Sequence, residues 1–130
     1  MSALLRFESL SLDYRTAEGW SRAVSDVTLE VEPGEVLGLV GESGSGKTTL
    51  GLTALGYLPG NGKVASGRAL FEGHDMLSLP YPKLARLRGA RIGFVPQNPT
   101  TALNPALRIG VQLAEGILAH TGLSGAAAAR

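Results

Sequence analysis

The glycine-rich stretch that decides the fold reads Gly41-Glu42-Ser43-Gly44-Ser45-Gly46-Lys47-Thr48. It fits every fixed position of G-x-x-x-x-G-K-[ST], a pattern typical of loops that hold phosphate groups. The glycines let the backbone fold tightly enough for several N–H groups to point at one phosphate. A helix that follows the loop adds the positive end of its dipole. We therefore expect this loop to bind the phosphates of a nucleotide.

Three side chains at the end of the loop are candidates for that chemistry. Lys47 supplies a mobile positive charge for the β- and γ-phosphates, the Thr48 hydroxyl can hold Mg²⁺, and Thr49 is a further phosphate contact. The alternative is an accidental glycine turn at the start of a helix, which the complete motif and its flanking pattern disfavour. The loop alone does not choose among kinases, GTPases, DNA-acting ATPases and transport ATPases.

The segments on either side of the loop have the pattern of an α/β fold. The continuous apolar run at 35–40 predicts a strand buried on both faces, and residues 47–58 predict a helix. The other expected elements are strands at 4–14, 27–31, 68–71 and 92–95, helical turns at 82–87 and from Ala106 onward, and loops at 15–22 and 99–105.

Composition excludes several classes of function. The chain has 130 residues and a formal net charge of +1, which gives no support for general attraction to nucleic acid or anionic lipid. It contains no cysteine, which excludes disulfides and thiolate metal sites. Hydrophobic residues make up 44% of the chain, enough for a buried core. The length fits one domain or part of a larger one.

A second segment narrows the class of nucleotide-binding protein. Phe94-Val95-Pro96-Gln97-Asn98-Pro99 follows a short apolar run, and Gln97 lies 50 residues after Lys47. This segment resembles the Q-loop of ABC transporter ATP-binding domains, and residues 23–35 resemble the segment that these domains carry before the phosphate loop. Within the family, the chain is most similar to the oligopeptide, dipeptide and nickel importer ATPases. That similarity rests on residues 41–47, on 87–92 and on Ala102-Leu103-Asn104-Pro105.

The resemblance implies a fold and a domain organisation. The fold would be α/β: the P-loop NTPase core of an ABC-type nucleotide-binding domain with an N-terminal antiparallel β subdomain, ending at the start of the helical subdomain. Residues 1–130 would then be the N-terminal portion of one such domain, with the phosphate loop at 41–48 and the Q-loop near residue 97. The rest of the domain would be absent.

Some motifs of the family are missing from the sequence. No apolar run followed by Asp-Glu supplies the Walker B aspartate and the catalytic glutamate. Leu123-Ser124-Gly125 begins like the family's signature but lacks the rest of it, and we reject it. We therefore expect these 130 residues alone not to turn over ATP.

The resemblance also implies a site that binds ATP and Mg²⁺. Tyr14 would stack on adenine, although it could instead be an ordinary strand aromatic packed in the core. Gln97 would be catalytic and would touch Mg²⁺ or the attacking water, sharing the metal with Thr48. The nucleotide-binding residues would be Tyr14, Gly41, Glu42, Ser43, Gly44, Ser45, Gly46, Lys47, Thr48 and Thr49.

By the same resemblance, the chain would belong to the ATP-binding subunit of a transporter for a peptide-like or related small solute. Its partners would be transmembrane permease subunits, a second ATP-binding domain and, indirectly, a solute-binding protein, but no nucleic acid. It would lie at the cytoplasmic face of the inner membrane, held there through the permease. Two alternatives stay open: a non-transport ABC ATPase of DNA repair or translation, and a truncated, non-catalytic nucleotide-binding remnant.

Overall fold

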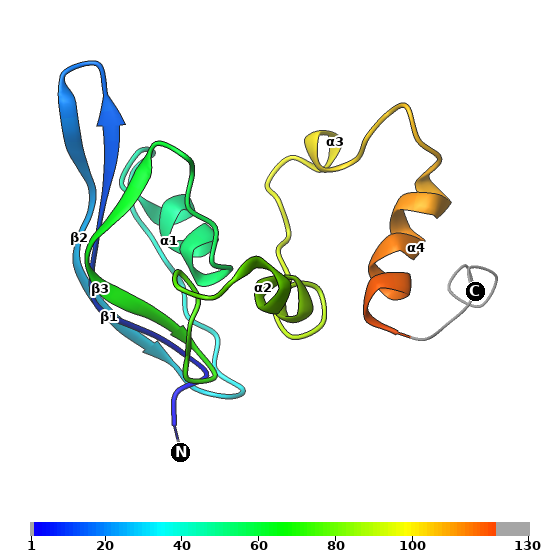
Figure 1. Cartoon of the computed structure of the whole chain (residues 1–130), viewed down its shortest axis with the longest axis horizontal. Helices are drawn as coiled ribbons and strands as arrows, with labels where there is room; N and C mark the ends of the chain where they lie inside the picture. Colours follow the sequence, from blue (N-terminus) through cyan, green and yellow to red (C-terminus); the bar gives the residue numbers. More distant parts are fainter. Residues whose placement is uncertain (1, 122–130) are drawn as a thin grey trace. The chain divides into compact units, whose positions relative to one another are not determined.

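The structure, a computed structural model, describes residues 2–121 (Figure 1). The chain divides into two compact units, Met1–Leu84 and Ala85–Arg130. The first unit holds an antiparallel sheet and the phosphate loop, and the second holds the segment around Gln97. Within the described part of the chain, no helix combines the length and the apolar character needed to cross a membrane.

A four-stranded antiparallel sheet with the order β2-β1-β3-β4 forms the framework of the first unit. Its strands are β1 (Leu5–Thr16), β2 (Gly19–Val31), β3 (Gly62–Phe71) and β4 (His74–Asp75). This confirms the expected antiparallel β subdomain. The prediction of a loop at 15–22 is wrong, because the β1–β2 ladder continues to the pair Thr16 and Gly19. Gly19 has φ +118, a backbone angle that lets the chain reverse there within a short turn.

The core of the first unit lies between the sheet and the helix that follows the phosphate loop. Phe7, Leu10 and Leu12 of β1 are almost fully buried, as are Ala69 and Phe71 of β3. Thr53 and Ala54 provide the buried face of α1 (Lys47–Ala54). Burial of such side chains contributes about 1.5–3 kcal/mol each for the larger ones. The sheet therefore fixes α1, and with it the end of the phosphate loop.

Helix α1 ends earlier than the sequence predicts. It was expected over 47–58, but its last helical residue is Ala54. The Tyr57 N–H donates to Leu52 O at 3.0 Å and the Gly56 N–H donates to Thr53 O at 2.9 Å, while Gly56 has φ +73. These bonds form a Schellman motif, in which a left-handed glycine closes the helix.

The strand predicted at 35–40 is wrong. The structure has this segment as irregular backbone, with Val36 and Val40 each 95% exposed. A strand needs a partner strand for its backbone hydrogen bonds, and the described sheet pairs only the four strands named above. Leu37 and Leu39 turn the other way and line an apolar crevice together with Phe7 and Leu50.

The second unit is mainly helical among its described residues. Its elements are the end of α2 (Tyr81–Leu87), α3 (Pro99–Ala102) and α4 (Ile109–His120). Helices at 82–87 and after Ala106 are confirmed, whereas the polar loop predicted at 99–105 begins as α3. Asn98 caps α3 by accepting from the Thr100 N–H at 3.1 Å, and proline occupies the first turn.

The strand predicted at 92–95 reduces to one isolated bridge. Ile92 pairs in parallel with Arg88, and Val95 is 92% exposed. An apolar run becomes a strand only where a partner strand accepts its backbone hydrogen bonds. Among the described residues of this unit, Ile92 has a β-bridge partner only in the short segment at Arg88.

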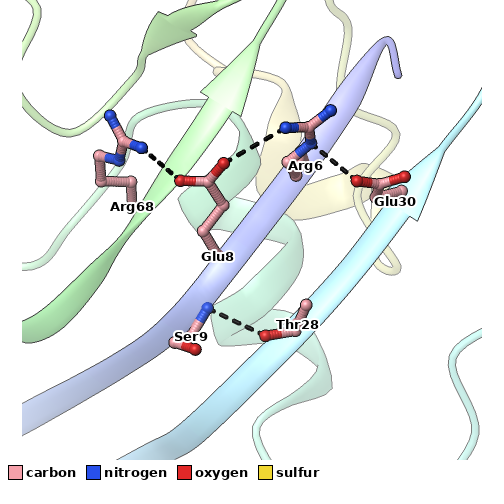
Figure 2. Close-up of polar contacts among 6 residues, drawn as sticks. All are labelled: Arg6, Glu8, Ser9, Thr28, Glu30 and Arg68. Carbon is pink, nitrogen blue, oxygen red and sulfur yellow. Dashed lines mark hydrogen bonds and ion pairs between the residues drawn. The ribbon is translucent and has the colours of Figure 1, made fainter. Parts of the chain in front are cut away.

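A row of charged side chains crosses three strands on the outer face of the sheet (Figure 2). Arg6 Nε lies 2.8 Å from Glu30 Oε1, and Arg6 Nη1 lies 3.3 Å from Glu8 Oε1. Arg68 Nη2 donates to the other oxygen of Glu8 at 2.5 Å. The hydrogen bond from Arg68, followed by the bond from Arg6, lowers the pKa of Glu8 below its ordinary value, although partial desolvation acts in the opposite direction.

The lowered pKa predicts a pH-dependent contribution of Glu8 to stability. Ionised Glu8 stabilises the fold fully above its unfolded pKa of about 4.5, and this contribution is lost as pH falls through the lower folded pKa. The stability difference between wild type and Glu8→Gln should therefore be present at neutral pH and shrink below about pH 4.5. Urea unfolding across pH measures it, with the exposed Glu18→Gln as control. An equal difference at every pH would contradict the pairing.

Gly67 provides a test of the register between β1 and β3. It has φ +81, and a β-carbon there would overlap the carbonyl oxygens of Glu8 and Ser9. Gly73 has φ +82 but open space around it, which makes it a matched control. Alanine at either position adds backbone strain of about 1–2 kcal/mol, and at Gly67 overpacking adds ~1–3 kcal/mol more. Thermal unfolding should show a clearly larger loss for Gly67→Ala, and equal losses would mean that the strands do not approach so closely.

Candidate functional site

The phosphate loop connects the irregular segment 35–40 to α1, and two of its glycines are required by the backbone. Gly44 has φ +84 and Gly46 has φ +98, conformations that L side chains rarely adopt. The Ser45 N–H donates to Glu42 O at 3.2 Å and closes a turn within the loop. The predicted residues 41–48 are thus brought together in one tight loop, which is exposed over most of its length.

Gly46 also fixes the position of the phosphate loop against the sheet. A β-carbon at this position would lie 3.1 Å from the Ala23 carbonyl oxygen and 3.4 Å from a methyl group of Val24. Both neighbours belong to β2, so the end of the loop packs directly on the sheet backbone. The contact with β2 was not anticipated from the sequence, because the motif reports only that a glycine is needed there.

The Lys47 ammonium lies inside the loop. Its Nζ donates to Gly41 O at 2.6 Å, to Glu42 O at 2.7 Å and to Ser45 Oγ at 3.3 Å. An ammonium has three N–H donors, and these three oxygens of the loop match them. The positive charge is therefore held at the centre of the loop rather than on an extended side chain.

The start of α1 offers backbone donors beside this charge. Gly46 is the N-cap residue and has no side chain to cap the helix, and the first intrahelical bond runs from Leu50 N to Gly46 O at 2.9 Å. The N–H groups of Lys47, Thr48 and Thr49 therefore precede the intrahelical ladder. Together with the helix dipole they favour an anion at this end. The exposed Thr48 places a hydroxyl, a suitable ligand for a hard cation, at the same end.

Tyr14 comes close to the phosphate-loop helix although it lies on β1. Its hydroxyl donates to Thr49 Oγ1 at 3.4 Å. A β-carbon on Gly62 would lie only 2.8 Å from Cε1 of the ring, so Gly62 leaves room for the tyrosine. Sequence reasoning missed Gly62, whose only signal was the turn cluster Pro59-Gly60-Asn61-Gly62. Tyr14 is half-buried, and its stacking on adenine stays a prediction.

Gln97 belongs to the second unit, where it is exposed in an irregular segment beside Pro96. Its contact with metal or water stays a prediction. The rejected signature at Leu123-Ser124-Gly125 lies outside the described residues. Within residues 2–121, no group of three or more His, Asp or Glu side chains is placed to hold a metal ion.

Comparison with known proteins agrees with this fold. The family model described as ABC transporter matches residues 24–128. The chain therefore belongs to the ABC transporter family of ATP-binding proteins. A solved dimeric structure of a bacterial ABC transporter cassette matches with a TM-score of 0.79 at 24% identity, over 96% of this chain and 52% of that one. This likeness confirms the predicted ABC-type fold.

Similar curated proteins include ATP-binding proteins named for the import or transport of peptides. A putative peptide import ATP-binding protein of Brucella abortus is 43% identical over 94% of this chain and 37% of its own length. The oligopeptide transport ATP-binding protein OppD of Escherichia coli is 40% identical over 97% of this chain and 37% of its own. The dipeptide transport ATP-binding protein DppD of Lactococcus lactis is 36% identical over 90% and 34%. The chain thus spans little more than a third of these relatives.

Tyr14 can be tested by separating its ring from its hydroxyl. If the ring stacks on a base, Tyr14→Phe should keep nucleotide affinity, while Tyr14→Ala should weaken it about tenfold or more, since stacking on an aromatic ring contributes ~1–3 kcal/mol. Titration with a fluorescent adenine nucleotide measures both. Unchanged affinity of folded Tyr14→Ala with a lowered melting temperature would show that the ring is only a packing residue.

Proposed function

We propose that this chain is the nucleotide-binding part of the ATP-binding subunit of an ABC importer for peptides or related small solutes. The observation that carries the nucleotide-binding part of the proposal is the phosphate loop, in which the Lys47 ammonium and the uncapped start of α1 converge. Both features favour a polyphosphate anion at one place. We further propose that residues 1–130 are the N-terminal portion of one nucleotide-binding domain.

The residues of the loop fit ATP with Mg²⁺. The backbone N–H groups at the start of α1 would hold the phosphates, while Lys47 would exchange bonds to its own loop for bonds to the β- and γ-phosphates. Thr48 would hold Mg²⁺ through its hydroxyl, and Tyr14 would lie against adenine. The metal supplies charge neutralisation for phosphoryl transfer to water. Gln97 would act at the same centre by touching Mg²⁺ or orienting the water.

Transport is supported by the relatives rather than by the loop. One of the three relatives is named for peptide import and the other two for oligopeptide or dipeptide transport, whereas the phosphate loop is common to many ATPases. This favours transport over a role in DNA repair or translation. We accordingly propose a second ATP-binding domain, permease subunits and, indirectly, a solute-binding protein as partners. The subunit would then lie at the cytoplasmic face of the membrane, attached through the permease.

The proposal is tested at Lys47. Lys47→Ala removes the cation at the centre of the loop, and we expect at least a tenfold loss of Mg·ATP affinity in this chain and near-complete loss of hydrolysis in the full subunit. Lys83→Ala, an exposed lysine on α2, is the matched control and should change neither.

Circular dichroism should show the same fold in both variants, since the Gly46 contact with β2 involves no lysine side chain. Wild-type ATP affinity and hydrolysis in Lys47→Ala would overturn the assignment of the loop.

A further inference from the structure

The side-chain amide of Gln112 forms hydrogen bonds with both the backbone N–H and the backbone C=O of Asn104. Gln112 lies on α4, and its Oε1 accepts from the Asn104 N–H at 2.7 Å. Its Nε2 donates to Asn104 O at 2.9 Å. One side-chain amide thus pairs with one residue's backbone in the way that a neighbouring strand would. Asn104 belongs to the segment Leu103-Asn104-Pro105 that follows the Gln97 region.

Further bonds close the chain between Asn104 and Gln112 into one loop. Gln112 Nε2 also donates to Leu107 O at 3.0 Å, and the Leu107 N–H donates to Asn104 O at 3.1 Å. The Ala106 N–H donates to the Asn104 side chain at 2.9 Å. Gln112 is half-buried, while Asn104 is exposed. The side chain that makes the bonds therefore belongs to the less exposed of the two residues. The segment is therefore tied to α4 at several points.

This arrangement differs from ordinary helix capping. Arg108 is the N-cap residue of α4 and makes no side-chain bond to the helix. A cap would satisfy N–H groups inside the first turn, whereas Gln112 mainly binds groups that lie outside the helix. Its bonds therefore join two segments instead of finishing one.

We propose that Gln112 is a positioning residue that makes residues 104–107 and α4 one rigid piece. A displacement of α4 is then passed directly to the segment that leads back to Gln97. This second step rests on the proposed transport function, in which the Gln97 region reports on the nucleotide. The competing explanation is that Gln112 only stabilises α4.

Amide hydrogen exchange on the 130-residue chain tests the rigid piece without any assumption about function. Gln112→Met keeps the side-chain length but removes the amide, and Gln112→Ala removes both. The exposed Glu115→Ala on the same helix is the control. We expect the Asn104 amide to exchange about threefold to tenfold faster in both Gln112 variants and unchanged in the control. The amides at 115–120 should keep their wild-type rates.

Two results of the exchange experiment would overturn the proposal. Wild-type exchange at Asn104 in Gln112→Met would show that the bonds do not hold the segment. Equal acceleration at Asn104 and along 115–120 would show that Gln112 only stabilises the helix.

The complete transporter tests the second step. Gln112→Met should leave ATP affinity unchanged and lower the solute transported per ATP hydrolysed severalfold, a ratio that helix stability alone does not move. An unchanged ratio would overturn the coupling role. If the wild-type assembly bound no ATP, the proposed function would fall, and the exchange rates would still decide whether Gln112 holds Asn104.

Discussion

The contact between Gly46 and the backbone of β2 is the constraint on which the site depends. A β-carbon at Gly46 would lie 3.1 Å from the Ala23 carbonyl oxygen, which is closer than most such contacts, and the φ of +98 at this position disfavours any side chain. The same glycine leaves α1 without a side-chain cap and adopts the left-handed angle that ends the loop. One residue thereby sets the position of the loop, the direction of α1 and the availability of its first N–H groups. The antiparallel sheet matters to the site because it supplies the surface for this contact.

The parts of the fold that local signals define could be predicted, and those that depend on distant partners could not. The alternating strands, the phosphate loop and α4 follow from patterns within a few residues. The run at 35–40 has the composition of a central strand, yet a strand exists only through its neighbours, and the described sheet offers it none. Helix α1 was predicted too long because Gly56 was treated as an interior residue rather than as a stop.

The candidate site also has a part that local sequence signals predict and a part that depends on distant contacts. The loop residues form a contiguous motif whose chemistry is visible in the sequence, and the structure brings them together. Tyr14 came from the resemblance, and its proximity to Thr49 is a long-range contact. Neither the turn signal around Gly62 nor the helical pattern around Gln112 indicates a role in a site, because turn glycines and helix glutamines occur in most proteins. Their contacts with Tyr14 and Asn104 depend on how the chain folds back.

The position of the Lys47 ammonium has a consequence for how tightly the loop could hold a ligand. Its three donors already bond to oxygens of the loop, so any bond to a phosphate replaces a bond that exists. The gain on binding is then a difference between two sets of hydrogen bonds, and the loop recovers its own set when the ligand leaves. Such an exchange gives a smaller net gain in affinity than an ammonium with no bonds of its own would give. A compact ammonium suits it, since a planar guanidinium could not turn three donors between two such sets of oxygens.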